Sequence, residues 1–126
     1  MLHRCVERIE LPSKITLGKG TGHERTYDII SFFKKGEREI SRFEMDKRIK
    51  ALNVSLGRED RQYILRYQRE IPFELRWNAF FLFNREKHPE DEALVAFVLW
   101  DKYDWICLWA RFDLWSNIVY GLRRRR

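Results

Sequence analysis

The sequence has few residues of the kinds that build metal centres, disulfide frameworks or redox sites. Its 126 residues include two cysteines, Cys5 and Cys107, and three histidines, which stand in no metal-binding or redox spacing. The start of the chain carries too much charge for a signal peptide. We therefore expect a cytoplasmic protein with reduced thiols, without a metal and without a cofactor.

Long apolar runs are also missing. The longest begins at Ala93 and stops before Asp101, whereas a membrane-spanning helix needs about 20 apolar residues. Asn and Gln are scarce while Arg, Lys and Glu abound, a balance typical of heat-adapted proteins. The length suits one α+β domain over residues 1–122, followed by a basic tail over residues 123–126.

Catalytic constellations are equally sparse. No serine or cysteine has a recognisable base partner nearby in the sequence. Nitrogen and carboxylate ligands meet only at His23 with Glu24 and at His88 with residues 90–92. We therefore expect that the protein is not an enzyme, with a metal near His88 as the remaining alternative.

Positive charge is unevenly distributed along the chain. Residues 1–72 hold 16 Lys and Arg against 11 Asp and Glu, whereas residues 73–122 hold 5 against 8. The last four residues are all arginine and supply two thirds of the net charge of +6. A basic surface of this kind favours nucleic-acid phosphates or an acidic partner, and a solvated tail is the other interpretation.

The aromatic stretch over residues 93–115 predicts a β-hairpin. Residues 93–100 are apolar on both faces of an extended strand, and residues 105–112 repeat the pattern after a polar connection. We expect a four-residue loop built on a type I turn. The register then pairs Trp100 with Trp105 and Ala96 with Trp109.

Cap and stop signals predict three short helices before this hairpin. Thr21 with Glu24 and Ser41 with Glu44 are capping-box patterns, and Pro72 ends the third helix. The expected α+β fold has helices over residues 22–35, 41–52 and 58–70, an antiparallel sheet over 73–83, 93–100 and 105–112, and a short C-terminal helix. Short edge strands are expected over residues 3–11 and 13–17.

Three helices followed by strands resemble the winged helix-turn-helix family over about residues 24–100. The resemblance implies that the third helix enters the major groove of duplex DNA. Glu59 and Asp60 depart from it, because acids in the first turn of that helix repel phosphates. The other interpretation is a solvated charged helix face. The candidate nucleic-acid contacts are Arg58, Arg61, Gln62, Arg66 and Arg69, together with Arg123, Arg124, Arg125 and Arg126 of the tail.

The glycine-rich segment over residues 17–22 leads from an expected strand into an expected helix. Free amides at a helix N-terminus bind anions, so Lys19, Gly20 and Thr21 form a candidate anion loop. The spacing matches neither the dinucleotide fingerprint nor the Walker loop. A tight turn without a ligand is the alternative interpretation.

A sheet that is apolar on both faces must bury each face against other elements. The helices cover one face, and we expect the terminal segments or a second copy of the chain to cover the other. The sequence therefore predicts a homodimer through the aromatic sheet.

Two functions remain open. The first is a small basic nucleic-acid-binding protein, such as a DNA-binding regulator or packaging factor. The second is a non-enzymatic interaction or structural subunit, for example of a virus or mobile element, that uses the aromatic sheet as its interface.

Overall fold

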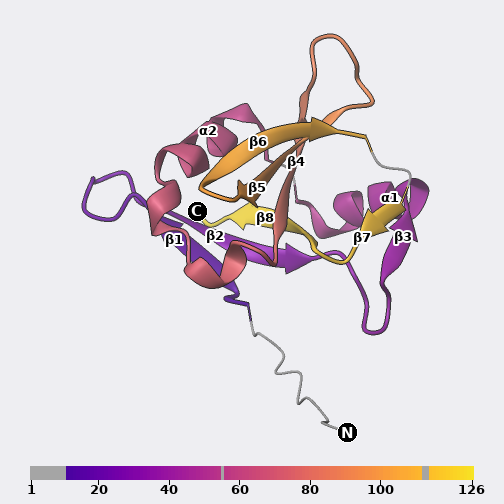
Figure 1. Ribbon diagram of the computed structural model, residues 1–126, viewed down its shortest axis with the longest axis horizontal. Helices are drawn as coiled ribbons and strands as arrows, with labels where there is room; N and C mark the ends of the chain where they lie inside the picture. Colours follow the sequence, from indigo (N-terminus) through magenta and orange to yellow (C-terminus); the bar gives the residue numbers. More distant parts are fainter. Residues whose placement is uncertain (1–10, 55, 112–113) are drawn as a thin grey trace, which may run out of the picture.

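The computed structural model describes residues 11–54, 56–111 and 114–126. A curled six-stranded sheet in the order β1-β2-β8-β4-β5-β6 lies beside a two-stranded ribbon, β3-β7 (Figure 1). The strands are β1 (Lys14–Leu17), β2 (Arg25–Ser31), β3 (Glu39–Ser41), β4 (Phe80–Lys87), β5 (Val95–Asp101), β6 (Asp104–Ala110), β7 (Leu114–Ser116) and β8 (Val119–Arg124). The helices are α1 (Arg42–Leu52) and α2 (Arg58–Arg66), with short 3₁₀ turns η1 (Gln68–Glu70) and η2 (Phe73–Leu75).

The last strand lies in the middle of the sheet. β8 pairs antiparallel with β2, where Ile29 faces Leu122, and parallel with β4, where Phe81 faces Tyr120. Among the strands that the structure describes, only the C-terminal β8 therefore joins the β1-β2 hairpin to the β4-β5-β6 meander.

Each face of the sheet carries a core of its own. On one face, Phe81 and Val98 pack with Ile64 of α2, with Leu75 of η2 and with Ile71, which follows η1. On the other face, Phe97 packs with Met45 of α1 and with residues of the β3-β7 ribbon. Figure 1 shows α2 and α1 on opposite sides of the strands.

Two sequence predictions are confirmed in detail. The helix expected over residues 41–52 is α1, where the Ser41 side chain accepts a hydrogen bond from the Glu44 amide at 3.2 Å. The hairpin has the predicted register, with Trp100 opposite Trp105 and Ala96 opposite Trp109. Its loop is shorter than expected, because β5 and β6 remain paired as far as Asp101 and Asp104.

The helix predicted over residues 22–35 is wrong, because this segment contains β2. The Thr21 hydroxyl donates to the Gly18 carbonyl at 2.6 Å and accepts from the His23 amide at 3.1 Å. These bonds close the β1-β2 turn and leave no cap for a helix. The expected strand over residues 13–17 is β1, while the one over residues 3–11 lies almost entirely outside the described residues.

The other element boundaries also need correction. The helix expected over residues 58–70 ends at Arg66 and continues as η1. The strand expected over residues 73–83 begins only at Phe80, and its first residues form η2. Phe73 in η2 and Trp77 after it are each 66% exposed, whereas Leu75 and Ala79 are buried. The alternating apolar residues therefore do not share one buried face.

The predicted C-terminal helix is wrong, since that segment forms β7 and β8. Val119 and Leu122 lie in the cores on opposite faces of the sheet, which suits a strand between two others. Gly121 allows close packing there, because a Cβ atom would lie 2.5 Å from Val54 Cγ1. Arg123 and Arg124 belong to β8 and do not lie beyond the fold.

The winged-helix arrangement is also wrong. A helix-turn-helix needs its last two helices packed on each other. Here α1 and α2 pack into the cores on opposite faces of the sheet. The chain thus covers both faces with its own elements, and the reason for expecting a face-to-face homodimer no longer applies. The homodimer itself stays a prediction.

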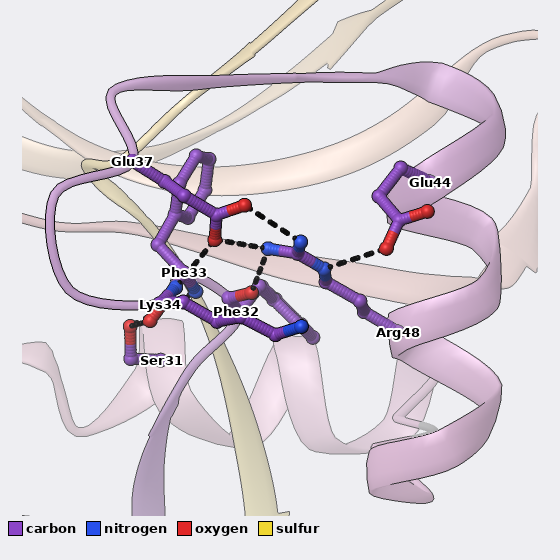
Figure 2. A network of polar contacts seen from close by, with 7 residues as sticks. All are labelled: Ser31, Phe32, Phe33, Lys34, Glu37, Glu44 and Arg48. Carbon is purple, nitrogen blue, oxygen red and sulfur yellow. Dashed lines mark hydrogen bonds and ion pairs between the residues drawn. The ribbon is translucent and has the colours of Figure 1, made fainter.

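An ion-pair network ties the β2-β3 connection to α1 (Figure 2). The Arg48 guanidinium contacts Glu37 at 2.6 Å and Glu44 at 3.1 Å, and donates to the Phe32 carbonyl at 2.9 Å. Glu37 also accepts from the Lys34 amide. The hydrogen bonds from Arg48 and the Lys34 amide lower the pKa of Glu37 to about 2.

This network makes stability depend on pH. Since the pKa of Glu37 falls on folding from about 4.5 to about 2, its contribution is complete above pH 4.5 and is lost as the pH falls through about 2. We expect Glu37→Gln to lower the urea midpoint at neutral pH, and we expect its difference from the wild type to shrink between pH 4.5 and 2.

Glu39→Gln is the matched control, because Glu39 is exposed on the neighbouring strand β3. It should keep the wild-type pH dependence. A Glu37→Gln difference that stays constant down to pH 2 would contradict the assignment. Urea unfolding followed by circular dichroism provides the measurement.

Candidate nucleic-acid interface

A basic groove of about 1020 Å³ lies where the ends of β8 and α1 meet the start of α2. Its lining contains six arginines against two carboxylates, Glu24 and Asp60. Such a concentration of positive charge attracts anions. The six arginines are Arg25, Arg85, Arg123, Arg124, Arg125 and Arg126.

Strand pairing positions the C-terminal arginines of this groove. In the β2-β8 register, Arg123 faces Asp28 and Arg124 faces Tyr27. The amide of Arg125 continues the pairing by donating to the Thr26 carbonyl at 2.8 Å. The run of arginines that the sequence placed in a tail is therefore largely part of the sheet.

A bulge in β4 brings Arg85 to the groove. The pairing with β5 shifts from Phe83 opposite Ala96 to Lys87 opposite Val95, so the intervening residues of β4 leave the regular ladder. The Arg85 amide donates instead to the Leu56 carbonyl, in the α1-α2 connection, at 3.1 Å.

Asp60 of α2 organises one wall of the groove. Its carboxylate accepts from the Tyr27 hydroxyl at 2.6 Å and from Arg25 at 3.2 Å, and lies 3.9 Å from the Arg124 guanidinium. Burial and the hydrogen bond to Asp60 raise the pKa of Tyr27 well above its ordinary value, so the hydroxyl stays protonated. Arg25 also stacks on the Tyr63 ring at 4.2 Å.

The remaining arginines of the groove differ in whether their guanidinium groups contact other parts of the protein. Arg125 forms an ion pair with Asp28 at 2.7 Å and donates a hydrogen bond to it from Nε at 2.9 Å, which lowers the pKa of Asp28. The Arg123 guanidinium donates to the Leu52 carbonyl at the end of α1. Within the described ranges, no carboxylate lies at ion-pair distance from Arg85 or Arg126. Both are exposed and can contact an added anion.

The arginines predicted on the third helix do not line this groove. Arg58 and Gln62 are exposed on α2, and Arg61 is half-buried there. Arg66 and Arg69 line a separate hollow of about 460 Å³ whose lining also includes Glu70 and Asp104. The structure therefore gathers the C-terminal arginines and separates them from the helical ones.

The predicted anion loop already holds an anion from the same chain. Glu70 accepts from the Gly18 amide at 2.9 Å and from the Lys19 amide at 3.1 Å. Gly20 and Thr21 are exposed at the tip of the β1-β2 turn, where no helix N-terminus follows. The free amides expected from the sequence are thus used to fasten this turn to η1.

Sequence reasoning missed Arg25 and Arg85. Arg25 stood in an expected helix and Arg85 in an expected loop, where both were single charges among many. No local signal marks them, because the groove exists only once β8 returns beside β2.

His88, which the sequence offered as an alternative metal ligand, contacts other groups of the protein. Its Nδ1 accepts from the Glu90 amide at 3.1 Å, and its ring lies edge-on to Trp109 at 5.1 Å. Across the residues that the structure describes, no three His, Cys, Asp or Glu side chains gather as metal ligands. The described helices are also too short or too polar to cross a membrane.

Comparisons with known proteins give no relative from which to infer a function. No protein-family model, no curated protein and no solved structure matched the chain. A function is therefore inferred from the geometry and charge of the groove.

The role of Asp60 can be separated from that of its neighbour Glu59, since both pair with Arg25. The Asp60 side chain is 15% exposed, and its removal leaves the hydroxyl of the buried Tyr27 without its hydrogen-bond acceptor. The Glu59 side chain is 82% exposed. We expect Asp60→Ala to lower the free energy of unfolding by about 1 to 3 kcal/mol. We expect Glu59→Ala to cost less than about 1 kcal/mol. Urea titration measures both, and equal effects would contradict the assignment.

Proposed function

We propose that this protein is a cytoplasmic, non-enzymatic nucleic-acid-binding protein whose basic groove holds the phosphate backbone. The observation that supports the proposal is the set of six arginines lining one groove of about 1020 Å³. Two of them, Arg85 and Arg126, are exposed and have no carboxylate partner among the described residues.

Guanidinium groups suit this role because they hydrogen-bond phosphate oxygens in a fixed geometry. Asp60 in the groove and Asp28 on β2 engage Arg25 and Arg125 internally, so these two arginines hold the shape while the others meet the ligand. Contacts of this kind do not read base identity. We therefore expect weak sequence preference, a strong dependence on salt, and binding to duplex DNA.

A second candidate function is a protein-interaction or structural subunit, for example of a virus or mobile element. Phe73 and Trp77 are each 66% exposed, and the Arg76 guanidinium lies 4.2 Å from the centre of the Trp100 ring. An exposed Trp close to an Arg is typical of protein interfaces. A homodimer belongs to this proposal as well.

The groove is tested best with two double variants that remove equal charge from the two basic surfaces. Arg85→Ala with Arg126→Ala alters the groove, and Arg66→Ala with Arg69→Ala alters the hollow beside α2. We expect the groove variant to weaken binding and to reduce the slope of log affinity against log salt by about two. The control should stay close to the wild type.

Fluorescence anisotropy with duplex DNA, single-stranded DNA and RNA, measured from low to moderate salt, provides the data. Point variants are preferable to a truncation at Leu122, which would remove the end of a central strand. If the wild type binds none of the three probes, or if both double variants lose affinity equally, the groove is not the site.

A further inference from the structure

The bulge in β4 borders a second pocket besides the arginine groove. This bulge pocket, of about 320 Å³, is lined by residues of α1, β4, β5 and β7, which belong to the α1 face of the sheet. Within the bulge, Asn84 lines the pocket while its neighbour Arg85 lines the groove. The volume lies at the small end of the range for small-molecule sites, about 300 to 1,000 Å³, so it suits one compact ligand.

The bulge pocket combines apolar side chains with one amide that lacks a partner. Ile49, Leu82, Val95 and Trp115 are buried or half-buried in its lining. Asn84 is half-buried, and its Oδ1 is buried without accepting a hydrogen bond from any described residue. A buried acceptor in this state costs stability and calls for a partner. The χ2 torsion of Asn is broad, so the amide can turn toward a ligand in the pocket.

The charged side chains that line the bulge pocket are exposed and have no ion-pair partner among the described residues. Arg42, Asp46 and Lys50 lie four residues apart and share one face of α1. Lys87 comes from β4, and Glu92 comes from the β4-β5 connection. The described lining therefore offers an excess of positive charge together with acceptors for hydroxyl or amino groups. This combination suits an anion that also carries such donors.

We propose that the bulge pocket binds a single nucleotide. Its phosphate lies at Lys50 and Lys87, whose ammonium groups bind phosphate as point charges. The flat base packs on the apolar side chains, and its polar edge meets the Asn84 amide, which supplies both donors and an acceptor. Asp46 and Glu92 accept hydrogen bonds from ribose hydroxyls or base amino groups.

The same nucleotide chemistry has two sources. One is a free nucleotide, and the other is an unpaired nucleotide of a strand whose phosphates lie in the arginine groove. Asn84 and Arg85 are consecutive, so the pocket and the groove approach each other at the bulge. Only the second source rests on the proposed function, because a free nucleotide needs no contact with the groove.

Calorimetric titration tests the pocket without any nucleic acid. The probes are the four nucleoside monophosphates, the corresponding nucleosides and ribose 5-phosphate. We expect at least one nucleoside monophosphate to bind about tenfold or more tightly than its nucleoside and than ribose 5-phosphate, because each of these lacks one set of contacts. Equal binding of either control would overturn the proposal.

Two pocket variants locate the binding. Lys50→Ala with Lys87→Ala should weaken nucleotide binding by more than about tenfold. The control, Lys14→Ala with Lys47→Ala, removes equal charge from exposed positions outside the pocket and should keep the wild-type affinity. Asn84→Leu should abolish the preference for a nucleotide over ribose 5-phosphate without lowering the urea midpoint, because it removes a buried acceptor that has no donor. Unchanged affinity in both pocket variants, or a lower midpoint with the preference intact, would contradict the assignment.

A duplex with a short single-stranded overhang distinguishes the two sources. If a strand supplies the nucleotide, this probe binds more tightly than the blunt duplex, and an abasic overhang loses the gain. Arg85→Ala with Arg126→Ala should weaken both duplexes equally, whereas the pocket variants should remove only the gain. Nucleotide binding without such a gain assigns the free source, even if the groove binds no duplex. Absence of both nucleotide binding and the gain would overturn the proposal.

Discussion

The placement of β8 between β2 and β4 is the constraint on which the rest of the structure depends. This strand comes last in the sequence, yet of the described strands it alone joins the β1-β2 hairpin to the β4-β5-β6 meander. Its position requires glycine at residue 121, because a Cβ atom would lie 2.5 Å from Val54 Cγ1 and 2.7 Å from the Phe32 ring. The core on each face forms around this strand, with Leu122 on one side and Val119 on the other.

The same strand creates the arginine groove and the electrostatic problem that accompanies it. Successive arginines repel one another, so a fold that gathers them must supply compensating acids. Asp60 and Asp28 do so from α2 and β2, and each engages one guanidinium closely. The groove thus combines arginines that hold its shape with arginines left exposed.

Local signals predicted part of this structure well. The Ser41 cap and the left-handed Asn53 set the limits of α1. The aromatic hairpin formed in its expected register, because its strands are adjacent in the sequence and a short turn closes them. The same reasoning failed over residues 22–35, where a capping pattern described a turn, and near the C-terminus, where the apolar spacing predicted a helix but the segment forms β7 and β8.

By itself, then, the sequence determined the helix α1, the β5-β6 hairpin, and the abundance of arginine at the C-terminus. Tertiary structure alone decided that this terminus is a central strand, that two helices take opposite faces, and that Arg25 and Arg85 join the groove. The physical reason is distance along the chain. Caps and tight turns act over a few residues, whereas the contact between Asp28 and Arg125 spans 97 residues and leaves no local pattern.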